Sequence, residues 1–266
     1  MYEEQFIKMS VENGVWIMRG LDWDNPYRIR TWQELVNWIN EVGFLPLFGN
    51  AVKGFSAEEH VSPDYWWTGI RDEDPWEWRE IIASSHQVAY GKFFDQKAGF
   101  ISLEWLPFFV NYRRDGYDFD SRWEDGLANR REKKIMDMLT GRDDDVDMTF
   151  PTDQILSTEL KKKAGFGKGG EKNYPGIITG LQMQTYLVIT DFHRRINKRG
   201  EEYGMPVSVM LPPEAVWGYE TVTSAYNESP EQSYDRITAR IHEKFPDVQE
   251  SEIISVIGKR PDTVIS

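Results

Sequence analysis

Residues 186–211 read YLVITDFHRRINKRGEEYGMPVSVML, and this stretch decides the fold of the second half of the chain. Two apolar runs, YLVITDF and YGMPVSVML, flank a polar segment with Asn197 and Gly200, which are residues typical of turns. The pattern predicts an antiparallel β-hairpin. The predicted tip is basic, because four cations surround the turn: Arg194, Arg195, Lys198 and Arg199.

Three short helical patterns precede this hairpin. Thr152–Leu156 predicts the first helix, and Ser157 or Thr158 caps the second, which ends at residues 164–166. The glycine-rich stretch GFGKGGEKN then predicts a flexible joint. The third helix begins at Pro175, and its inward residues are Ile177, Ile178 and Leu181.

Helix, helix, helix and hairpin is the order of a winged helix-turn-helix. In such a module the third helix enters the major groove, and the hairpin, called the wing, contacts adjacent phosphates. The basic tip therefore predicts a wing for double-stranded DNA. Helices followed by a hairpin also occur as purely structural units, and some winged helices bind only proteins.

The charge balance of the chain reverses locally in the same region. The whole chain has a formal net charge of −13, whereas Ser157–Gly200 contains nine cations and only three carboxylates, so this stretch carries +6 and the remainder −19. A basic surface on an acidic protein is suited to phosphate contact, although a solvated basic surface is the plain alternative. We predict DNA contact by Lys161, Lys162, Lys163, Lys172, Thr179, Gln182, Arg194, Arg195, Lys198 and Arg199.

The first half of the chain is rich in aromatic residues, with most of the 11 Trp residues before residue 124. Residues 31–41 (TWQELVNWINE) and 74–85 (DPWEWREIIASS) predict helices, the second with Asp74 as N-cap and Pro75 at its first position. VAYGKFF and FISLEWLPFFV, joined by DQKAG, predict an aromatic hairpin over residues 88–110. Residues 127–139 predict a further helix.

The end of the chain returns to amphipathic order. SPEQSYDRITARIHEKFP predicts a helix with Ser229 as N-cap and Pro230 at its first position, and VQESEIISVIG predicts a last helix closed by Gly258. We therefore expect an α+β protein in three parts. These are an aromatic-rich α+β region (1–142), a winged-helix domain (150–220) and C-terminal helices that pack on the body (221–266).

Several classes of site and location are excluded by composition. The chain has no Cys, so disulfides and Cys-based metal or redox sites are excluded, as is typical of the cytoplasm. It has neither a secretory leader pattern nor 18 consecutive apolar residues, so we expect no membrane association.

The stretch DDDVDMTFPTDQ resembles a calcium-binding loop, but Met148 and Gln154 replace the required Gly and bidentate Glu. The four His show no paired ligand spacing, so we expect no metal and no cofactor.

The triplet Gln182-Met183-Gln184 is the candidate for catalysis. Paired amides hold a water and a base or sugar through neutral hydrogen bonds. Residues two apart on a helix diverge by about 200°, so only one of these amides faces the groove. We assign Gln182 to contact with a base or phosphate and Gln184 to the interior or a cap. If the protein is catalytic, the two amides position a water.

Two interpretations are possible for four tryptophans, Trp66, Trp67, Trp76 and Trp78. They form either a stacking platform for bases or part of the core. Their density favours packing, and Trp76 and Trp78 lie two apart on a predicted helix, so they face different ways.

Two stretches carry a family resemblance. Residues 150–219, from FPTDQILSTEL to PPEAVWGY, and residues 74–120, from DPWEWREIIASS to NYRRDGYDFD, resemble the bacterial AlkZ-related proteins. These are relatives of the winged-helix DNA glycosylases that remove bulky alkyl adducts. The resemblance implies winged-helix modules and DNA binding. In the characterised glycosylases a Gln-x-Gln or Gln-x-Asp motif near the N-terminus carries catalysis, and the comparable triplet here is Gln182–Gln184, late in the chain.

We thus expect a DNA-binding winged-helix protein that recognises or repairs alkylated DNA, in the second case as a glycosylase-like hydrolase. Two alternatives belong to other classes. A transcriptional regulator would bind duplex without chemistry, and it would need a dimer to meet two half-sites. A protein-interaction module would dock its basic face on an acidic partner.

Overall fold

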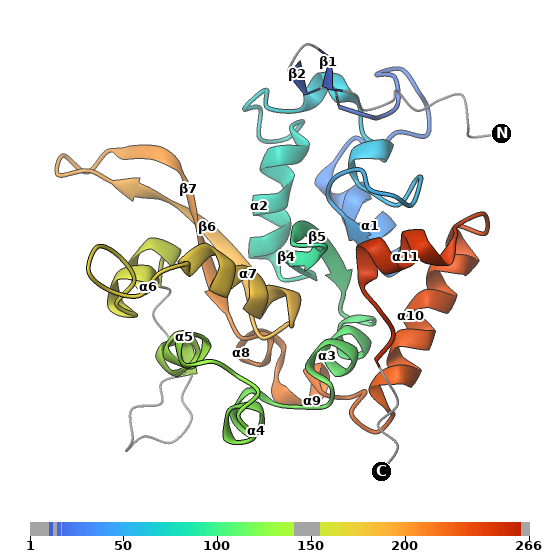
Figure 1. Cartoon of the computed structure of the whole chain (residues 1–266). Coiled ribbons are helices and arrows are strands. Elements are labelled where there is room, and N and C mark those ends of the chain that lie inside the picture. The colour runs from blue at the N-terminus through green and yellow to red at the C-terminus, as the bar shows by residue number, and fades with distance from the viewer. Residues whose placement is uncertain (1–10, 13–14, 17, 141–154, 262–266) are drawn as a thin grey trace.

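The computed structural model describes residues 11–12, 15–16, 18–140 and 155–261. Its centre is a five-stranded antiparallel sheet in the order β3-β5-β4-β6-β7, surrounded by helices (Figure 1). The strands of this sheet are β3 (Phe44–Pro46), β4 (Val88–Phe94), β5 (Lys97–Ser102), β6 (Val188–Ile196) and β7 (Glu202–Leu211). A separate pair is formed by β1 (Val11–Glu12) and β2 (Val15–Trp16). The α+β class predicted from the sequence is confirmed.

The described helices divide into two groups, one before and one after the β6–β7 hairpin. The bounds before the hairpin are α1 (Trp32–Val42), α2 (Pro75–Ser85), α3 (Leu106–Arg114), α4 (Phe119–Glu124), α5 (Arg130–Thr140), α6 (Ser157–Lys163) and α7 (Tyr174–Met183). After the hairpin come α8 (Pro213–Trp217), α9 (Tyr219–Val222), α10 (Pro230–Lys244) and α11 (Glu250–Ile257). Among the described residues, no helix is both long enough and apolar enough to cross a membrane.

The first predicted hairpin is confirmed, but its second strand is shorter than expected. Asp95 and Gln96 both have positive φ (46° and 61°), the backbone that two-residue hairpin turns require. β5 ends at Ser102, and α3 begins at Leu106 where a strand was predicted. The reason is that EWLPFFV places a Pro in the first helical turn and buries Leu106, Phe109 and Val110 at helical spacing.

The hairpin of residues 186–211 is also confirmed, with a shorter turn. β6 continues to Ile196, so Arg194 and Arg195 lie in the strand, and only Lys198 and Arg199 belong to the turn. The Asn197 side chain stabilises this turn by accepting hydrogen bonds from the backbone N–H groups of Arg199 (2.8 Å) and Glu201 (3.1 Å).

At the end of the stretch Thr152–Leu156, where a helix was predicted, the chain makes a strand contact instead. Residues 152–154 lie outside the described residues, and Leu156 forms an isolated antiparallel bridge with Val209 of β7. α6 starts at Ser157 without a side-chain cap, because the N-cap residue is Leu156 and not the predicted Ser157 or Thr158. The Ser157 hydroxyl lies 3.1 Å from the hydroxyl of Tyr174.

The helix predicted over residues 127–139 starts later, at Arg130. Asn129 and Glu132 explain this start. The Asn129 side chain accepts from the Glu132 N–H at 3.1 Å, and the Glu132 carboxylate accepts from the Asn129 N–H at 2.9 Å. This reciprocal pair is the geometry of a capping box.

The C-terminal helices follow the sequence prediction closely. α10 starts at Pro230, and Ser229 forms a capping box with Gln232. α11 ends before Gly258, whose N–H bonds to the Ile254 carbonyl. The predicted boundaries of α10 and the predicted end of α11 are confirmed, whereas α11 begins two residues into the predicted stretch, at Glu250 with Gln249 as N-cap.

Two hydrophobic clusters fill the interior. The first contains residues from α1, α2, α3, β3–β5, α10 and α11, whereas the second contains residues from α4–α7 and the base of the hairpin. The sheet runs through both clusters, because Tyr90 of β4 pairs with Ile189 of β6. Ile189 packs against both clusters. The hairpin is thus anchored at its base and projects from the body at its outer end (Figure 1).

Arg113 and Arg114, at the end of α3, connect the two clusters. Arg113 donates to the carbonyls of Phe93 (3.1 Å), Met183 (3.3 Å) and Ile257 (2.6 Å). The last two are the final residues of α7 and α11. Carbonyls at a helix end have no partner within their own helix, so the guanidinium supplies donors to both, and the Tyr112 hydroxyl also donates to the Ile257 carbonyl at 3.2 Å.

Asp74 organises the loop that leads into α2. Its carboxylate is fully buried and accepts hydrogen bonds from the backbone N–H groups of Trp67 (3.1 Å), Gly69 (3.0 Å) and Trp76 (2.8 Å). The predicted N-cap is confirmed, and the same carboxylate also fixes the backbone of the preceding loop. It holds Trp67 at φ 59°, a backbone conformation that is unfavourable for a large side chain.

We predict that Asp74→Ala lowers the free energy of unfolding by about 3 kcal/mol, because three backbone donors lose their acceptor. Ser229→Ala is the matched control: it also removes a helix N-cap, at an exposed site, and should cost about 1 kcal/mol. Urea denaturation of both variants measures the difference. Equal losses would contradict the role given to Asp74.

Candidate nucleic-acid interface

The hairpin carries its four cations on exposed positions. Arg194, Arg195, Lys198 and Arg199 are all exposed to solvent. Arg194 donates to the Gly204 carbonyl across the hairpin at 3.2 Å, and its Nε lies 4.0 Å from the Glu202 carboxylate. Both partners of this ion pair are exposed, so the pair is weak and leaves the arginine available to a phosphate.

The α6–α7 segment supplies a second group of exposed cations. Lys161, Lys162 and Lys163 form the last turn of α6, where positive charge is favoured by the helix dipole. Lys168 and Lys172 lie in the loop that follows, and both are exposed.

Glu171 ties this loop to α5. It accepts from Lys134 at 2.9 Å and lies 3.7 Å from Arg131. The hydrogen bond from Lys134 lowers the pKa of Glu171. Arg131 also donates to the Lys172 carbonyl at 3.1 Å. One carboxylate is therefore shared by two α5 cations, and the loop is held beside them.

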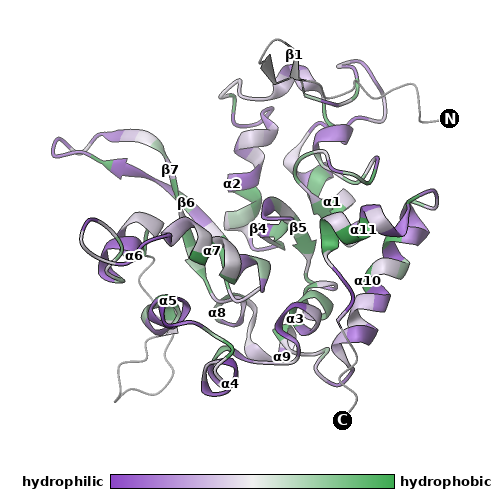
Figure 2. Ribbon diagram, viewed as in Figure 1, coloured by the Kyte–Doolittle hydropathy of each residue, from purple (hydrophilic) through white to green (hydrophobic). Residues whose placement is uncertain are grey.

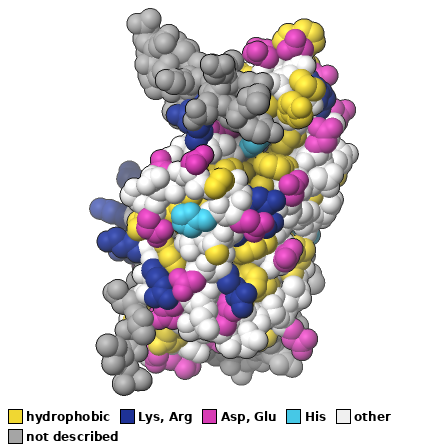
Figure 3. All heavy atoms as spheres, turned by 90° about the vertical axis from the view of Figure 1, so that its right-hand side faces the viewer, with side chains coloured by type: hydrophobic (Ala, Val, Ile, Leu, Met, Phe, Trp, Pro, Cys, Tyr) yellow, Lys and Arg dark blue, Asp and Glu magenta, His cyan; other side chains and the backbone are white. Residues whose placement is uncertain are grey.

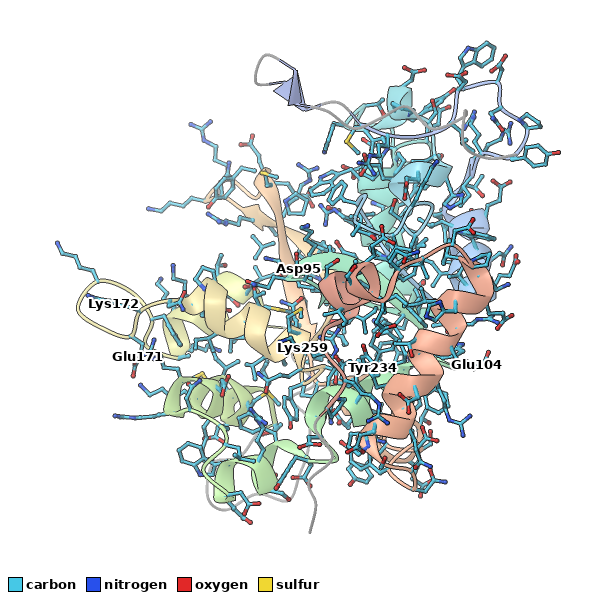
Figure 4. All side chains as sticks on the ribbon, turned by 45° about the vertical axis from the view of Figure 1, so that its right-hand side comes forward. Asp95, Glu104, Glu171, Lys172, Tyr234 and Lys259 are labelled. Atoms are coloured by element: carbon cyan, nitrogen blue, oxygen red, sulfur yellow. The ribbon has the colours of Figure 1, made fainter. Side chains whose placement is uncertain are left out.

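The elements that carry the two groups of cations extend on the same side of the molecule. Figures 1 and 4 show the β6–β7 hairpin and the loop with Lys172 extending to the side opposite α10 and α11. Leu156 joins the start of α6 to β7 through its bridge with Val209. Figure 2 shows hydrophilic residues at the outer end of the hairpin and on α6. Cations that are far apart in the sequence thus lie on neighbouring elements.

α7, the third predicted helix, is largely buried. Its inward residues Ile177, Ile178 and Leu181 are confirmed as core. Thr179 is only 9% exposed and Gln182 only 2%, so the positions that were expected to face DNA are also interior. The exposed residues of α7 are Pro175 and Gly176, neither of which carries a polar side chain. α7 therefore presents no exposed polar side chain that could contact bases. The prediction that this helix reads bases in a groove is not supported.

The amide of Gln182 is engaged inside the protein. Its Oε1 accepts from the backbone N–H of Lys92 at 3.0 Å, and its Nε2 donates to the Ile178 carbonyl at 3.3 Å. Gln184 is the C-cap of α7, and its Nε2 donates to the Gly180 carbonyl at 3.2 Å. The two amides thus have separate partners, and Gln184 occupies the cap position expected for it.

Lys92 is a residue near this site that sequence reasoning missed. It is exposed, and its Nζ lies 3.5 Å from the Thr179 hydroxyl oxygen. The sequence feature that could have identified Lys92 is its position in VAYGKFF, where it is the single charged residue, between Gly91 and Phe93, which are both buried. It adds one cation beside α7.

A family model described as AlkZ related matches residues 29–258. The chain belongs to the AlkZ-related family. The match includes the hairpin, α5–α7, the second hydrophobic cluster and all of the first except Met18. No curated protein and no solved structure matched the chain.

The aromatic residues of this AlkZ-related protein are mainly packed. Trp66 is 6% exposed and Trp78 is 1% exposed, so packing is confirmed for these two. Trp67 is exposed, and Trp76 is partly buried beneath the Arg79 guanidinium, 3.9 Å from its ring. The same guanidinium lies 4.5 Å from the ring of Phe192 in β6, so Arg79 connects α2 to the hairpin.

We predict that Gln182→Met lowers the free energy of unfolding by about 2 kcal/mol, because the buried Lys92 N–H contact loses its acceptor. Gln184→Met at the half-buried cap should cost about 0.5 kcal/mol. Thermal or urea denaturation compares the two. A larger loss for Gln184→Met would contradict the interior role of Gln182.

Proposed function

We propose that this AlkZ-related protein binds double-stranded DNA through a winged-helix module formed by α5, α6, α7 and the β6–β7 hairpin. The observation that carries the proposal is the protruding hairpin, with four exposed cations beside the exposed lysines of α6, on a chain of net charge −13. Three helices before a hairpin, a short strand contact at Leu156 and a hydrophobic cluster of their own support a module of this kind.

The proposed module is larger than the domain expected at residues 150–220, because its first helix is α5 (Arg130–Thr140), from the region assigned to residues 1–142, in place of Thr152–Leu156. The hairpin would lie along the phosphate backbone, and Lys161–Lys163 with Lys172 would contact the neighbouring phosphates. α7 would support this surface from inside rather than enter a groove.

Contacts of this kind position a protein on DNA but carry little sequence information. The low sequence information of these contacts favours recognition of damaged duplex over recognition of an operator sequence. Membership of the AlkZ-related family supports alkylated DNA as the target. The buried, fully engaged amide of Gln182 favours recognition without base removal. We therefore propose a damage-recognition protein, and Gln182 as a positioning residue for Lys92 and β4.

Duplex binding across a salt series is the first test. We expect the affinity to fall steeply with salt, and Arg194→Glu/Arg195→Glu to lower the slope of log affinity against log salt by about 2, at about 0.9 per lost phosphate contact. Lys97→Glu/Lys259→Glu makes the same change of charge at exposed sites outside the hairpin and should keep the slope nearly unchanged. Equal effects of the two double variants would refute the assignment of the hairpin.

A second test compares intact duplex with the same duplex treated with a simple alkylating agent. We expect tighter binding to the alkylated duplex at fixed salt, with the preference reported as a ratio of Kd values. Alkali-labile abasic sites, measured after incubation, distinguish recognition from repair. No preference for the alkylated duplex would leave DNA binding intact and refute damage recognition, and abasic product would assign glycosylase chemistry.

A further inference from the structure

One tryptophan, Trp67, is held at the surface in an unfavourable backbone conformation. It is 53% exposed, and its φ of 59° lies in the left-handed region, which large side chains rarely adopt. The fully buried Asp74 carboxylate fixes this conformation by accepting from the N–H groups of Trp67 and Gly69. A Gly or an Asn would make the same turn with less strain, so the turn itself does not account for an indole ring at this position.

Trp67 lies at the end of a row of flat groups that leads to the hairpin. The centroid of its ring lies 6.4 Å from that of Trp76, and the Arg79 guanidinium lies 3.9 Å from the Trp76 ring. The same guanidinium lies 4.5 Å from the ring of Phe192 in β6. Trp76 and Arg79 are three residues apart on α2, so they share one face of this helix. The loop that presents Trp67 and the hairpin therefore contact the same face of α2.

A carboxylate of α2 lies near both of these segments. Burial raises the pKa of Glu80, and the charge of the neighbouring Arg79 opposes this rise. The charges of Arg194, from the hairpin, and Arg71, from the loop that contains Trp67, act in the same direction as Arg79. The surface proposed to hold phosphate and the exposed ring of Trp67 are thus neighbours.

The surroundings of Trp67 are acidic, unlike the hairpin. Residues 64–80 contain six carboxylates and only two arginines. Asp72 and Glu73, which follow the exposed Ile70 in the same loop, are both exposed. On the side of α1, α10 and α11, by contrast, Figure 3 shows both signs of charge intermixed with hydrophobic side chains. An electron-rich ring among carboxylates attracts a flat cation and repels phosphate.

Alkylation of DNA produces flat cations. An alkyl group added to a ring nitrogen that has no proton to lose leaves the base with a positive charge, whereas an alkyl group added to an exocyclic oxygen leaves the base neutral. A damaged base also leaves the duplex stack at a lower cost than an intact one. Once displaced, a base stacks on an exposed aromatic side chain, and a positive charge strengthens that contact.

We infer that Trp67 stacks on a cationic, ring-alkylated base displaced from the duplex, with Asp72 and Glu73 favouring the charge of that base. This inference rests on the proposed binding of alkylated duplex, and it adds the residue that distinguishes a charged lesion from a neutral one. Because the nearby carboxylates repel phosphate, the site contributes discrimination, and the hairpin contributes the affinity for intact duplex.

Two duplexes of otherwise identical sequence test this selectivity. One contains a single 1-methyladenine, which is cationic, and the other a single O6-methylguanine, which is neutral. Both lesions disturb base pairing, so a preference between them reports charge. We expect the full chain to bind the 1-methyladenine duplex about tenfold more tightly, and Trp67→Leu to reduce this ratio to below about twofold. Fluorescence anisotropy of labelled duplex measures the Kd values.

Three further variants separate the ring from the charge. Trp23→Leu is the matched control, because it removes a similarly exposed indole outside this loop and should keep the tenfold ratio. Trp67→Phe should keep part of the ratio, because a smaller ring remains. Asp72→Asn/Glu73→Gln should lower the ratio and strengthen binding to intact duplex, a combination that a merely structural role of the loop would not produce. Thermal unfolding confirms that each variant is folded.

Failure of this inference and failure of the proposed function give different results. If the chain binds duplex, equal Kd values for the two lesions, or a ratio retained by Trp67→Leu, would overturn the role of Trp67 and leave duplex binding intact. If the chain binds no duplex, the proposed function fails, and calorimetric titration with nucleosides decides the inference. 1-Methyladenosine should then bind more tightly than adenosine, with the preference lost in Trp67→Leu. Equal binding of the two nucleosides would overturn it.

Discussion

The position of the hairpin depends on two adjacent arginines at the end of α3. Arg113 donates to the last carbonyls of α7 and α11, and Arg114, which is 1% exposed, donates to the Thr185 carbonyl and to the Glu214 carboxylate. Helix ends leave carbonyls without partners, and a guanidinium with five donors satisfies several at once. Because Thr185 lies three residues before β6 begins at Val188, these contacts fix where the hairpin leaves the body.

Burial of α7 determines how such a module would meet DNA. α7, an apolar helix with the buried amide of Gln182, fills the space between the sheet and α5, so the exposed cations of the region lie on α6, the following loop and the hairpin. Cations of this kind give affinity that depends on salt, whereas discrimination comes from the shape and deformability of the duplex. Alkylated or weakened base pairs change those properties. Away from the hairpin, a cavity between α1 and the turn from α10 to α11 is lined by Trp38 and Phe245 together with four cations and four carboxylates.

Local patterns predicted most elements of the fold. Ser229 and Pro230 marked α10, Asp74 marked α2, and the turn residues around Asn197 marked the hairpin, because caps and turns act within a few residues. The exposure of Gln182 was not predictable, because it depends on β4 packing against α7 from 90 positions away. The cavity was hidden for the same reason: helical periodicity cannot indicate that Trp38 and Phe245 line one space. Long-range packing decided which polar residues stayed at the surface.

Hydrogen exchange of the full chain, with and without a 20-base-pair duplex, tests the central claim most directly. The claim is that cations distant in sequence form one binding surface. It predicts that duplex slows exchange in residues 157–172 and 190–205 together, while α1 and α10 exchange as before. Protection of only one of these two segments, or of the side formed by α1 and α10, would contradict it.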